Sequence, residues 1–492
     1  MSSEKCISYE DFGAVGDGVA DDLPAICAAH AHANAKGLPV KTKGNAIYHL
    51  GSQALTALIQ TDTDWNTSRF TIDDREVEDH SKALFHIASK IEPIELNIDC
   101  LSRDQKQLDL KPAGDCYVQV EDESTKRFIR RGLNRNEGYA QQDSFILRKD
   151  GSVEGPIDWD YESITRVEAH LIDETALRVR GGIFTTYANR MRQEVGYNYW
   201  GRSISVTRSN TEVEGVTHYV GGETDEGQPY RGFLDVRNCA NVTLRNCFVT
   251  GHKMYSTIGS AGEPVSMGSY DLHANHVVNL RLMHCRMNHI LDRSLWGVIG
   301  TNFCKNILLE DCTLSRMDVH MGVSGGYTLK RCTLGHMGLN AVGRGNLLLE
   351  ASTIYGYSLI NFRGDYGSIW DGDVVVKDCR WFPGYEGEVE PMMFNVINDG
   401  MHDFGYACSM PRHITVDGLT VDDRNHPDGY EGLVFFPDPD RGAEGALPDS
   451  RPFPYERSKS IQVKSLVALS GKEFRVSGNT ELEKQVAVTR EN

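Results

Sequence analysis

The sequence contains no apolar run that approaches the roughly 20 residues of a membrane-spanning helix, so we expect no membrane partner. Positive charge is also in short supply, because 51 Lys and Arg stand against 69 Asp and Glu, for a formal net charge of −18. Nucleic acids and anionic membranes bind basic surfaces, so this balance argues against both. The opening residues, MSSEKCISYEDFG, do not form a signal peptide, which predicts a cytoplasmic protein, or a secreted or periplasmic one if a signal peptide has been removed.

Metal-binding motifs are absent as well. The chain has 17 His and 12 Cys but no HExxH and no paired CxxC, the patterns of catalytic and structural zinc sites. Calcium requires several carboxylate oxygens, and the candidate carboxylates, Asp271, Asp292 and Asp318, are interleaved with histidines. We therefore predict no metal and no other cofactor.

What the sequence does contain is a repeat in its C-terminal half. Six segments share a polar residue, a β-rich run, and a Leu or Val three positions before a small residue, at intervals of 38, 27, 20, 20 and 27 residues. They are NVTLRNC, NLRLMHC, NILLEDC, GYTLKRC, NLLLEAS and DVVVKDC, which end at Cys247, Cys285, Cys312, Cys332, Ser352 and Cys379. Strands and polar turns without helices between them are typical of a solenoid that stacks rung upon rung, so we predict a parallel β-helix.

The repeat also predicts how each rung turns. The Leu or Val and the small residue are three apart, so in a straight strand they would face opposite sides; if both point inward, a bend lies between them. Five of the small residues are Cys, and a stack of small buried side chains explains them better than disulfides, so we predict free thiols. With 40% hydrophobic residues, the 492-residue chain can bury a large core as one elongated domain.

The start of the chain carries a motif typical of one superfamily. Residues 9–22 read YEDFGAVGDGVADD and precede the Ala-rich run LPAICAAHAHANAKG, with glycines for tight turns, Asp21 or Asp22 as a helix cap and Gly37 as its stop. This opening resembles that of the pectate lyase superfamily of right-handed β-helix proteins, in which an N-terminal helix covers the end of the solenoid. The resemblance implies an all-β, right-handed parallel β-helix that acts on a poly- or oligosaccharide. Polygalacturonases, other glycoside hydrolases, polysaccharide lyases, mannuronan epimerases and phage tailspikes share the opening, so it does not select an activity.

We divide the chain into four parts. Residues 1–64 form the N-terminal cap and first rungs, and residues 65–200, which alternate in a β pattern without the repeat, form an inserted β-rich subdomain. Residues 201–424 form the β-helix core with the active-site groove. Residues 425–492 form a C-terminal loop over the solenoid and terminal strands. The sequence carries no signal for an oligomeric state.

A polar site is predicted where the repeats are aligned on their small residues. Two Asp-x-His pairs then fall at one place, Asp271 with His273 and Asp318 with His320, the Asp 14 and the His 12 residues before its Cys. Asn340 lies 12 residues before the small residue of the next repeat. Residues i and i+2 of a strand share a face, and rungs about 4.8 Å apart would separate the two pairs by roughly 9 to 10 Å. A stacked, hydrogen-bonded ladder of Asn and His is the structural alternative to a catalytic site.

Our leading hypothesis is hydrolysis of a glycosidic bond. Side chains that lean together would bring Asp271 and Asp318 into the roughly 6.5 to 9.5 Å separation of inverting glycosidases, as acid and base. Repulsion between the carboxylates would raise one pKa, and His273 and His320 would orient the carboxylates or the sugar hydroxyls. Asp292 is expected on the intervening rung.

Further polar residues near these rungs are predicted to bind substrate. Arg363 or Lys253 would bind a carboxylate or sulfate, and Tyr366 or Trp370 would stack on a sugar face. The remaining candidates for substrate binding are Asn340, Asp365, Glu223 and Asp292.

Two alternatives stand beside hydrolysis. Tyr270-Asp271-Leu272-His273 resembles the YxDPH stretch of mannuronan epimerases and related alginate-acting enzymes, without its Pro. That resemblance implies a lyase or C5-epimerase in which His273 or Tyr270 removes the C5 proton of a uronate. Arg363 or Lys253 would then stabilise the carboxylate and its enolate. The polygalacturonase motifs NTD, DD, GHG and RIK are absent as a set, so pectin hydrolysis by that mechanism is not expected. The second alternative is a noncatalytic glycan-binding or tailspike-like protein.

Overall fold

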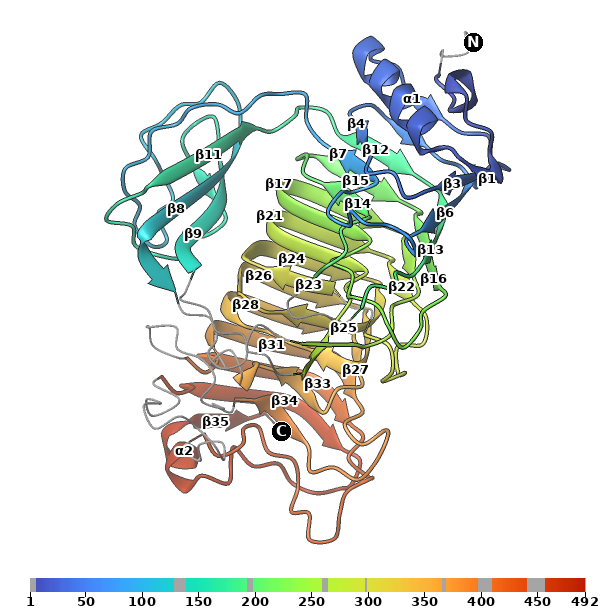
Figure 1. Cartoon of the computed structure of the whole chain (residues 1–492). Helices are drawn as coiled ribbons and strands as arrows, with labels where there is room; N and C mark the ends of the chain where they lie inside the picture. Colours follow the sequence, from blue (N-terminus) through green and yellow to red (C-terminus); the bar gives the residue numbers. More distant parts are fainter. Residues whose placement is uncertain are drawn as a thin grey trace, which may run out of the picture.

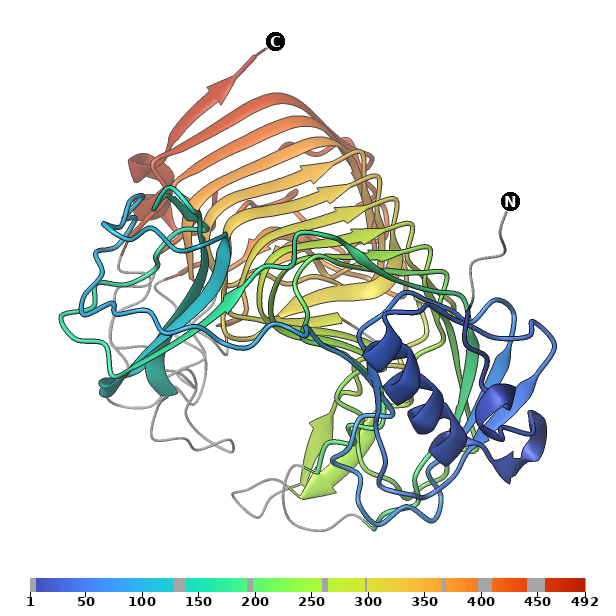
Figure 2. The same ribbon diagram turned by 90° about the horizontal axis from the view of Figure 1, so that it is seen from above.

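The computed structural model describes residues 6–127, 139–192, 198–258, 264–296, 299–364, 369–396, 409–439 and 456–491. Their strands stack into one parallel β-helix, with the N-terminal end and the C-terminal end of the chain at opposite ends of the stack (Figures 1 and 2). The predicted all-β solenoid is therefore confirmed. Neither helix among the described residues is long and apolar enough to cross a membrane.

The solenoid is a sheet of 27 strands whose pairings are parallel. The strands before the insertion are β1 (Asp17–Asp21), β2 (Val40–Lys41), β3 (Ile47–Leu50), β4 (Ala57–Ile59), β5 (Thr63–Asp64), β6 (Arg69–Asp73) and β7 (Phe85–Ile87). Those after it are β12 (Leu177–Arg180), β13 (Ile183–Tyr187), β14 (Ile204–Val206), β15 (Thr211–Glu214), β16 (Thr217–Gly221), β17 (Leu234–Arg245), β18 (Phe248–Val249), β21 (Leu272–Met283), β22 (Arg286–Met287), β23 (Ile299–Asn302), β24 (Cys304–Glu310), β25 (Thr313–Val319), β26 (Val323–Lys330), β27 (Thr333–Leu339), β28 (Gly343–Glu350), β29 (Thr353–Ile354), β31 (Trp370–Trp381), β33 (His413–Val421), β34 (Ser460–Ala468) and β35 (Ala487–Arg490). Two small pairs stand apart, antiparallel β19 (Tyr255–Ile258) with β20 (Pro264–Met267), and parallel β30 (Ser358–Asn361) with β32 (Met392–Asn395).

The N-terminal motif builds the cap of the solenoid. A 3₁₀ turn, η1 (Glu10–Phe12), leads through β1 into α1 (Leu23–Lys36), which lies across the end of the stack and packs against β4 (Figure 1). Gly37 ends the helix with φ 65°, as predicted. The carboxylate of Asp22 accepts from the backbone N–H of Val15 at 2.6 Å and does not cap the helix with its side chain, so this Asp fixes the preceding glycine turn instead.

The predicted bend between Leu and Cys is a left-handed residue directly before the small residue. These corner residues have φ between 49° and 56°, and they are Asn246, His284, Asp311, Arg331, Ala351 and Asp378. A single residue in this conformation turns the chain, so both flanking side chains face the interior. The anchor cysteines are buried and all cysteines of the described residues are free, which confirms the predicted stack of thiols.

The insertion is an antiparallel sheet with its own core, narrower than residues 65–200. Its strands, in sheet order, are β10 (Val153–Glu154), β9 (Tyr139–Leu147), β8 (Cys116–Arg127) and β11 (Arg166–Leu171). β6, β7, β12 and β13 fall inside the predicted insertion but pair within the solenoid. The insertion stands beside the solenoid in both views and touches it where the Tyr117 hydroxyl donates to the His276 carbonyl at 2.8 Å (Figures 1 and 2). At the C-terminal end, β34 and β35 flank a short helix, α2 (Thr480–Gln485).

Candidate functional site

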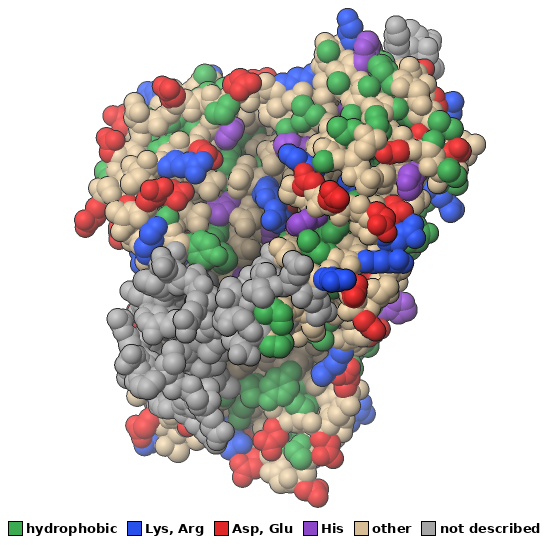
Figure 3. All heavy atoms as spheres, in the orientation of Figure 1, with side chains coloured by type: hydrophobic (Ala, Val, Ile, Leu, Met, Phe, Trp, Pro, Cys, Tyr) green, Lys and Arg blue, Asp and Glu red, His purple; other side chains and the backbone are tan. Residues whose placement is uncertain are grey.

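One register column on the solenoid brings polar side chains together. β17, β21, β23 and β25 pair so that Asp235, His273, Gly300 and Asp318 are neighbours on successive rungs. The residues just before them are core side chains, so this column faces away from the interior. Figure 3 shows His, Lys and Arg side chains gathered in the hollow between the insertion and the solenoid.

Gly300 leaves a gap in this column that the Tyr270 ring fills. A Cβ at position 300 would lie 3.0 Å from Cε1 of Tyr270 and 3.2 Å from its Cδ1 and Cζ. The ring centroid of Tyr270 is 5.9 Å from that of His273 and 5.9 Å from that of His320. The missing side chain at position 300 therefore lets the phenol lie between the two histidines.

Asp318 is fully buried and is held by two arginines and a histidine. Its Oδ2 accepts from Nη2 of Arg316 at 2.5 Å and from Nε2 of His320 at 2.7 Å. Its Oδ1 accepts from Nη1 of Arg363 at 2.9 Å. Burial by itself raises the pKa of this carboxyl, but the adjacent positive charges outweigh burial and hold the pKa well below its usual value. Asp318 is thus ionised at neutral pH, where it holds two arginines and a histidine in place.

The contacts of His320 define its tautomer. Its Nε2 lies 2.7 Å from the carboxylate of Asp318 and 3.2 Å from the hydroxyl oxygen of Tyr270. Because an ionised carboxylate only accepts, Nε2 carries the hydrogen and the lone pair of the neutral ring is on Nδ1. Burial lowers the pKa of His320 despite the opposing effect of Asp318, so the ring is neutral at pH 7. Its side chain is 25% exposed and can be reached by a substrate.

A second Asp–His pair, Asp235 with His273, lies in the same column. Nδ1 of His273 donates to Oδ1 of Asp235 at 2.8 Å, and Arg237 pairs with the other carboxylate oxygen. Burial raises the pKa of Asp235, but its bonds to His273 and Arg237 outweigh burial and lower the pKa. The His273 lone pair is therefore on Nε2. The sequence prediction missed Asp235, although it lies 12 residues before Cys247, the offset that identified His273.

The predicted alignment of Asp318 with Asp271 is wrong in register. Asp318 shares its column with His273, because the stretch from Asp318 to Tyr327 is two residues longer than the stretch it pairs with, Gly300 to Ile307. The spacing of the anchor cysteines does not show this difference. The offset between paired residues grows from 18 (Gly300 with Asp318) to 19 (Cys304 with Val323) and then 20 (Ile307 with Tyr327). Alignment on the cysteines therefore predicted His320 in the column of His273, where the structure has Asp318.

Asp271 belongs to a different buried cluster. Its Oδ1 lies 3.3 Å from Nδ1 of His218, and Nε2 of that histidine lies 2.9 Å from the Thr186 hydroxyl. The His218 ring stacks on Phe233 with a centroid distance of 3.8 Å. Both ionisable side chains are 1% exposed. Asp271 thus faces His218, and the geometry does not support a water-bridged acid and base pair with Asp318.

Glu223 and Lys253 come together in a loop cluster. Oε1 of Glu223 accepts from the Tyr255 hydroxyl at 2.6 Å and lies 3.0 Å from Nδ1 of His252. Burial raises the pKa of Glu223, but these partners outweigh it and lower the pKa. The backbone N–H of Lys253 donates to the same carboxylate at 3.1 Å, and its ammonium lies 5.0 Å from the Tyr255 ring centroid. These contacts join two loops, and the substrate-binding role stays a prediction.

Asn340 stands in the ladder that was the structural alternative. The register of β25 and β27 places it beside Asp318, and its Oδ1 accepts from Asn361 at 2.6 Å. Asn361 in turn accepts from Asn395 at 3.0 Å, so the column continues as stacked amides away from the histidines. The same face thus carries Asp–His pairs on some rungs and a ladder of stacked amides on others.

The remaining candidates are scattered. Asp292 is not on the intervening rung, which Gly300 supplies, but in an exposed turn where it accepts from the Ser294 backbone at 2.9 Å. Trp370 is fully buried, so it cannot stack on a sugar. Asp365 and Tyr366 lie outside the described residues. Among the described residues, no group of three His, Cys, Asp or Glu side chains could hold a metal ion.

Comparison with known proteins gives one local sequence match and several matches in fold. No family model matches the chain. Over 94 residues it is 37% identical to a capsule KL64-specific depolymerase of Klebsiella phage P510, a stretch that is 17% of this chain and only 9% of that protein. Tailspike gp49 of Pseudomonas phage LKA1 aligns with 98% of this chain and 84% of its own, at 12% identity and a TM-score of 0.50. The gp54 tailspike of Acinetobacter baumannii bacteriophage AP22, solved with a capsular saccharide, aligns with 98% of this chain and 79% of its own, at 11% identity and a TM-score of 0.52. The chain has the parallel β-helix fold of these tailspikes.

Proposed function

We propose that this protein binds and degrades a polysaccharide, and that it cleaves a uronate-containing chain by β-elimination. The local likeness to a capsule depolymerase supports the first part. One observation carries the second: Tyr270 lies between His273 and His320, and each histidine is bonded to a buried carboxylate. This arrangement is suited to moving protons, which is what elimination next to a carboxylate requires.

His273 is the base in this proposal and Tyr270 the acid. Nε2 of His273 takes the C5 proton of the uronate, the C5–H electrons form a C4–C5 double bond, and the C4–O bond breaks. The hydroxyl of Tyr270 protonates the departing oxygen, and water restores both groups afterwards. Asp235 fixes the His273 tautomer and stabilises the imidazolium that forms. The step balances without an external oxidant or reductant.

The charge around Asp318 suits an acidic sugar. Arg316 and Arg363 both pair with this one carboxylate, so the three groups carry a net positive charge. Arg363 is 14% exposed at its side chain, so its guanidinium can also reach a substrate carboxylate. Positive charge placed beside the uronate stabilises the enolate that develops as the C5 proton leaves.

Hydrolysis by paired carboxylates has weaker support. Asp235 and Asp318 are three rungs apart in the column, which is roughly 14 Å at about 4.8 Å per rung and exceeds the roughly 6.5 to 9.5 Å of inverting enzymes. Asp271 is bonded to His218 and does not supply the second carboxylate. Epimerisation would use the same base but return a proton to C5, so it would exchange C5 hydrogen with solvent without cutting the chain.

The test is a panel of acidic and neutral glycans, on which ultraviolet absorbance of unsaturated uronate and new reducing ends are measured together. We expect both signals from one acidic glycan, and a loss of both in His273→Ala and Tyr270→Phe. Tyr219→Phe is the matched control, because Tyr219 is 42% exposed on β16. Reducing ends without absorbance, retained in Tyr270→Phe, would contradict elimination in favour of hydrolysis. Binding without either product would favour a noncatalytic glycan-binding protein.

A further inference from the structure

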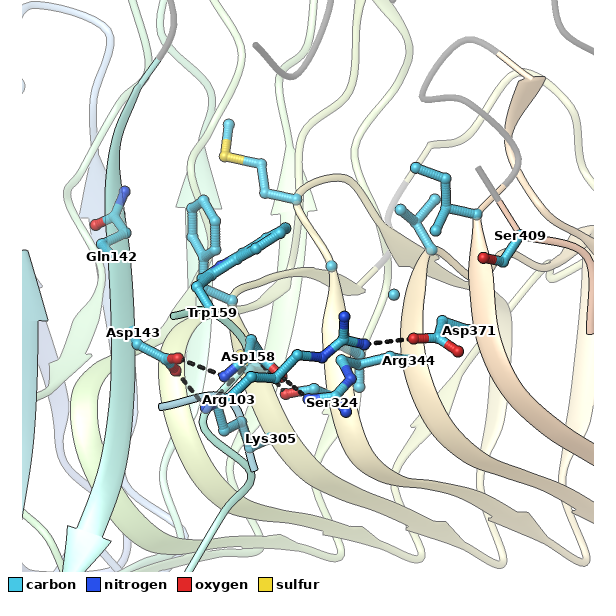
Figure 4. Close-up of a pocket in the computed structure, with 18 of the residues that line it drawn as sticks. Arg103, Gln142, Asp143, Asp158, Trp159, Lys305, Ser324, Arg344, Asp371 and Ser409 are labelled. Carbon is cyan, nitrogen blue, oxygen red and sulfur yellow. Dashed lines mark hydrogen bonds and ion pairs between the residues drawn. The ribbon is translucent and has the colours of Figure 1, made fainter. Parts of the chain in front are cut away.

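A pocket lies where the insertion meets the solenoid, around a corner from the site. It has a volume of about 200 Å³ and is lined by Trp159 of the insertion and by Met321, Ser324 and Arg344 of the solenoid. Figure 4 shows Arg103 reaching across it toward Asp371 on β31. The volume is below the roughly 300 to 1,000 Å³ of pockets for drug-sized ligands, so the pocket is of a size for one small ring.

The wall of this pocket combines an aromatic ring with fixed polar groups. The Arg127 guanidinium lies 4.1 Å from the centroid of the Trp159 ring and holds the indole in place. Oδ2 of Asp158 accepts from the Ser324 hydroxyl at 2.8 Å, and its Oδ1 accepts from Arg344 at 3.3 Å. Pockets with an apolar surface and a few oriented hydrogen-bonding groups bind small polar molecules in a defined pose, and an aromatic surface suits the apolar face of a sugar.

The charges of the pocket favour a neutral ligand. Each lining cation is paired with a carboxylate, and the pairs are Lys305 with Asp143, Arg344 with Asp158 and Arg103 with Asp371. Glu456 adds a further negative charge to the lining. Among the described residues that line the pocket, every positive charge is therefore paired with a carboxylate.

The pocket is adjacent to the candidate active site along the chain. β25 ends at Val319, His320 faces Tyr270, and the next residues, Met321 to Val323, turn the corner and line the pocket. Residues of a strand are about 3.3 Å apart, so the two surfaces are separated by a single corner of the rung.

We propose that this pocket is an accessory binding site for a neutral hexose of the same polysaccharide. The proposal rests on the proposed function and deepens it: the substrate would be a heteropolysaccharide in which a uronate lies at Tyr270 and His273 while a neutral sugar a few residues along lies against Trp159. The pocket would add affinity for long chains and would take no part in bond cleavage.

The experiment measures binding of methyl glycosides of glucose, galactose and mannose by saturation-transfer NMR, separately from any activity. At least one hexoside is expected to bind wild type and the control Tyr219→Ala. It should not bind Trp159→Ala or Met321→Ala, one variant in the insertion and one in the solenoid, which together cover the case in which one of them misfolds. No hexoside binding to wild type, or binding retained in both pocket variants, would overturn the proposal.

The same variants separate this proposal from that of the active site. On a cleaved polysaccharide, Trp159→Ala should raise KM for long chains several-fold and leave kcat unchanged. Hexoside binding without any unsaturated product would refute the elimination and leave the pocket standing. Unsaturated product with no hexoside binding would refute the pocket proposal and leave the elimination standing.

Discussion

Replacing Gly300 by Ala tests whether the position of Tyr270 matters for activity. Gly300 does not have a positive φ, so Ala introduces no backbone strain there. Its new methyl carbon would lie 3.0 Å from Cε1 of Tyr270, whereas carbon atoms in contact are about 3.5 to 4.0 Å apart. The ring must therefore move by about 0.5 Å, and the 3.2 Å contact between its hydroxyl and His320 would lengthen.

The size of the effect follows from this displacement. A misplacement of about 1 Å can cost about 10²-fold in rate, so we expect Gly300→Ala to lower kcat about tenfold, as measured by the release of unsaturated product. Gly326→Ala is the matched control, because its new carbon would meet only Oδ1 of Asn306, at 3.8 Å. It should leave kcat unchanged.

A double variant shows whether Gly300 acts through the Tyr270 hydroxyl. If it does, adding Gly300→Ala to Tyr270→Phe should cost little more than Tyr270→Phe alone, because both changes remove the same interaction. Equal kcat values for Gly300→Ala and Gly326→Ala would refute the reasoning. So would a double variant in which the two losses simply multiply.

Three further substitutions test the roles of charged side chains. Asp235→Asn should lower kcat by roughly 10² to 10⁴-fold, because the amide donates to Nδ1 of His273 and moves the hydrogen to Nε2; a pH profile of kcat checks it. Asp318→Asn should destabilise the fold by about 3 to 5 kcal/mol at pH 7. Since the folded pKa is lowered, this gap should close as denaturant unfolding is repeated below about pH 4. Lys305→Met should lower the melting temperature, because buried Asp143 loses its cation.

The solenoid could be predicted from the sequence because its signals are local. The small residue of each repeat lies just after a left-handed corner, so Cys247, Cys285 and Cys312 mark one place in every rung. Counting back 12 residues from them reaches Asp235, His273 and Gly300, which do share a column. The offset of Asp235 is visible in the sequence, but Asp235 is followed two residues later by Arg237 and so does not match the Asp-x-His pattern.

The contents of the site could be predicted only in part, because register depends on bulges. The two residues gained between Asp318 and Tyr327 include the left-handed Gly322 and Gly325, and either glycine could equally belong to an ordinary turn. A shift of two residues keeps the same face outward, so the hydrophobic pattern does not reveal it. Because of that shift, Asp318 lies in the same column as His273 and not in the same column as Asp271.

The proposed cleavage of an acidic polymer by an acidic chain requires the chain's positive charge to be local. The net charge of −18 opposes the approach of a polyuronate at long range, where salt screens it over about 8 Å at physiological ionic strength. Arg316 and Arg363 act at contact distance, and Asp318 holds both of them beside Tyr270 and His320. In the proposed mechanism Asp318 therefore stays ionised and positions two cations for a polyanionic substrate, and it does not itself exchange protons.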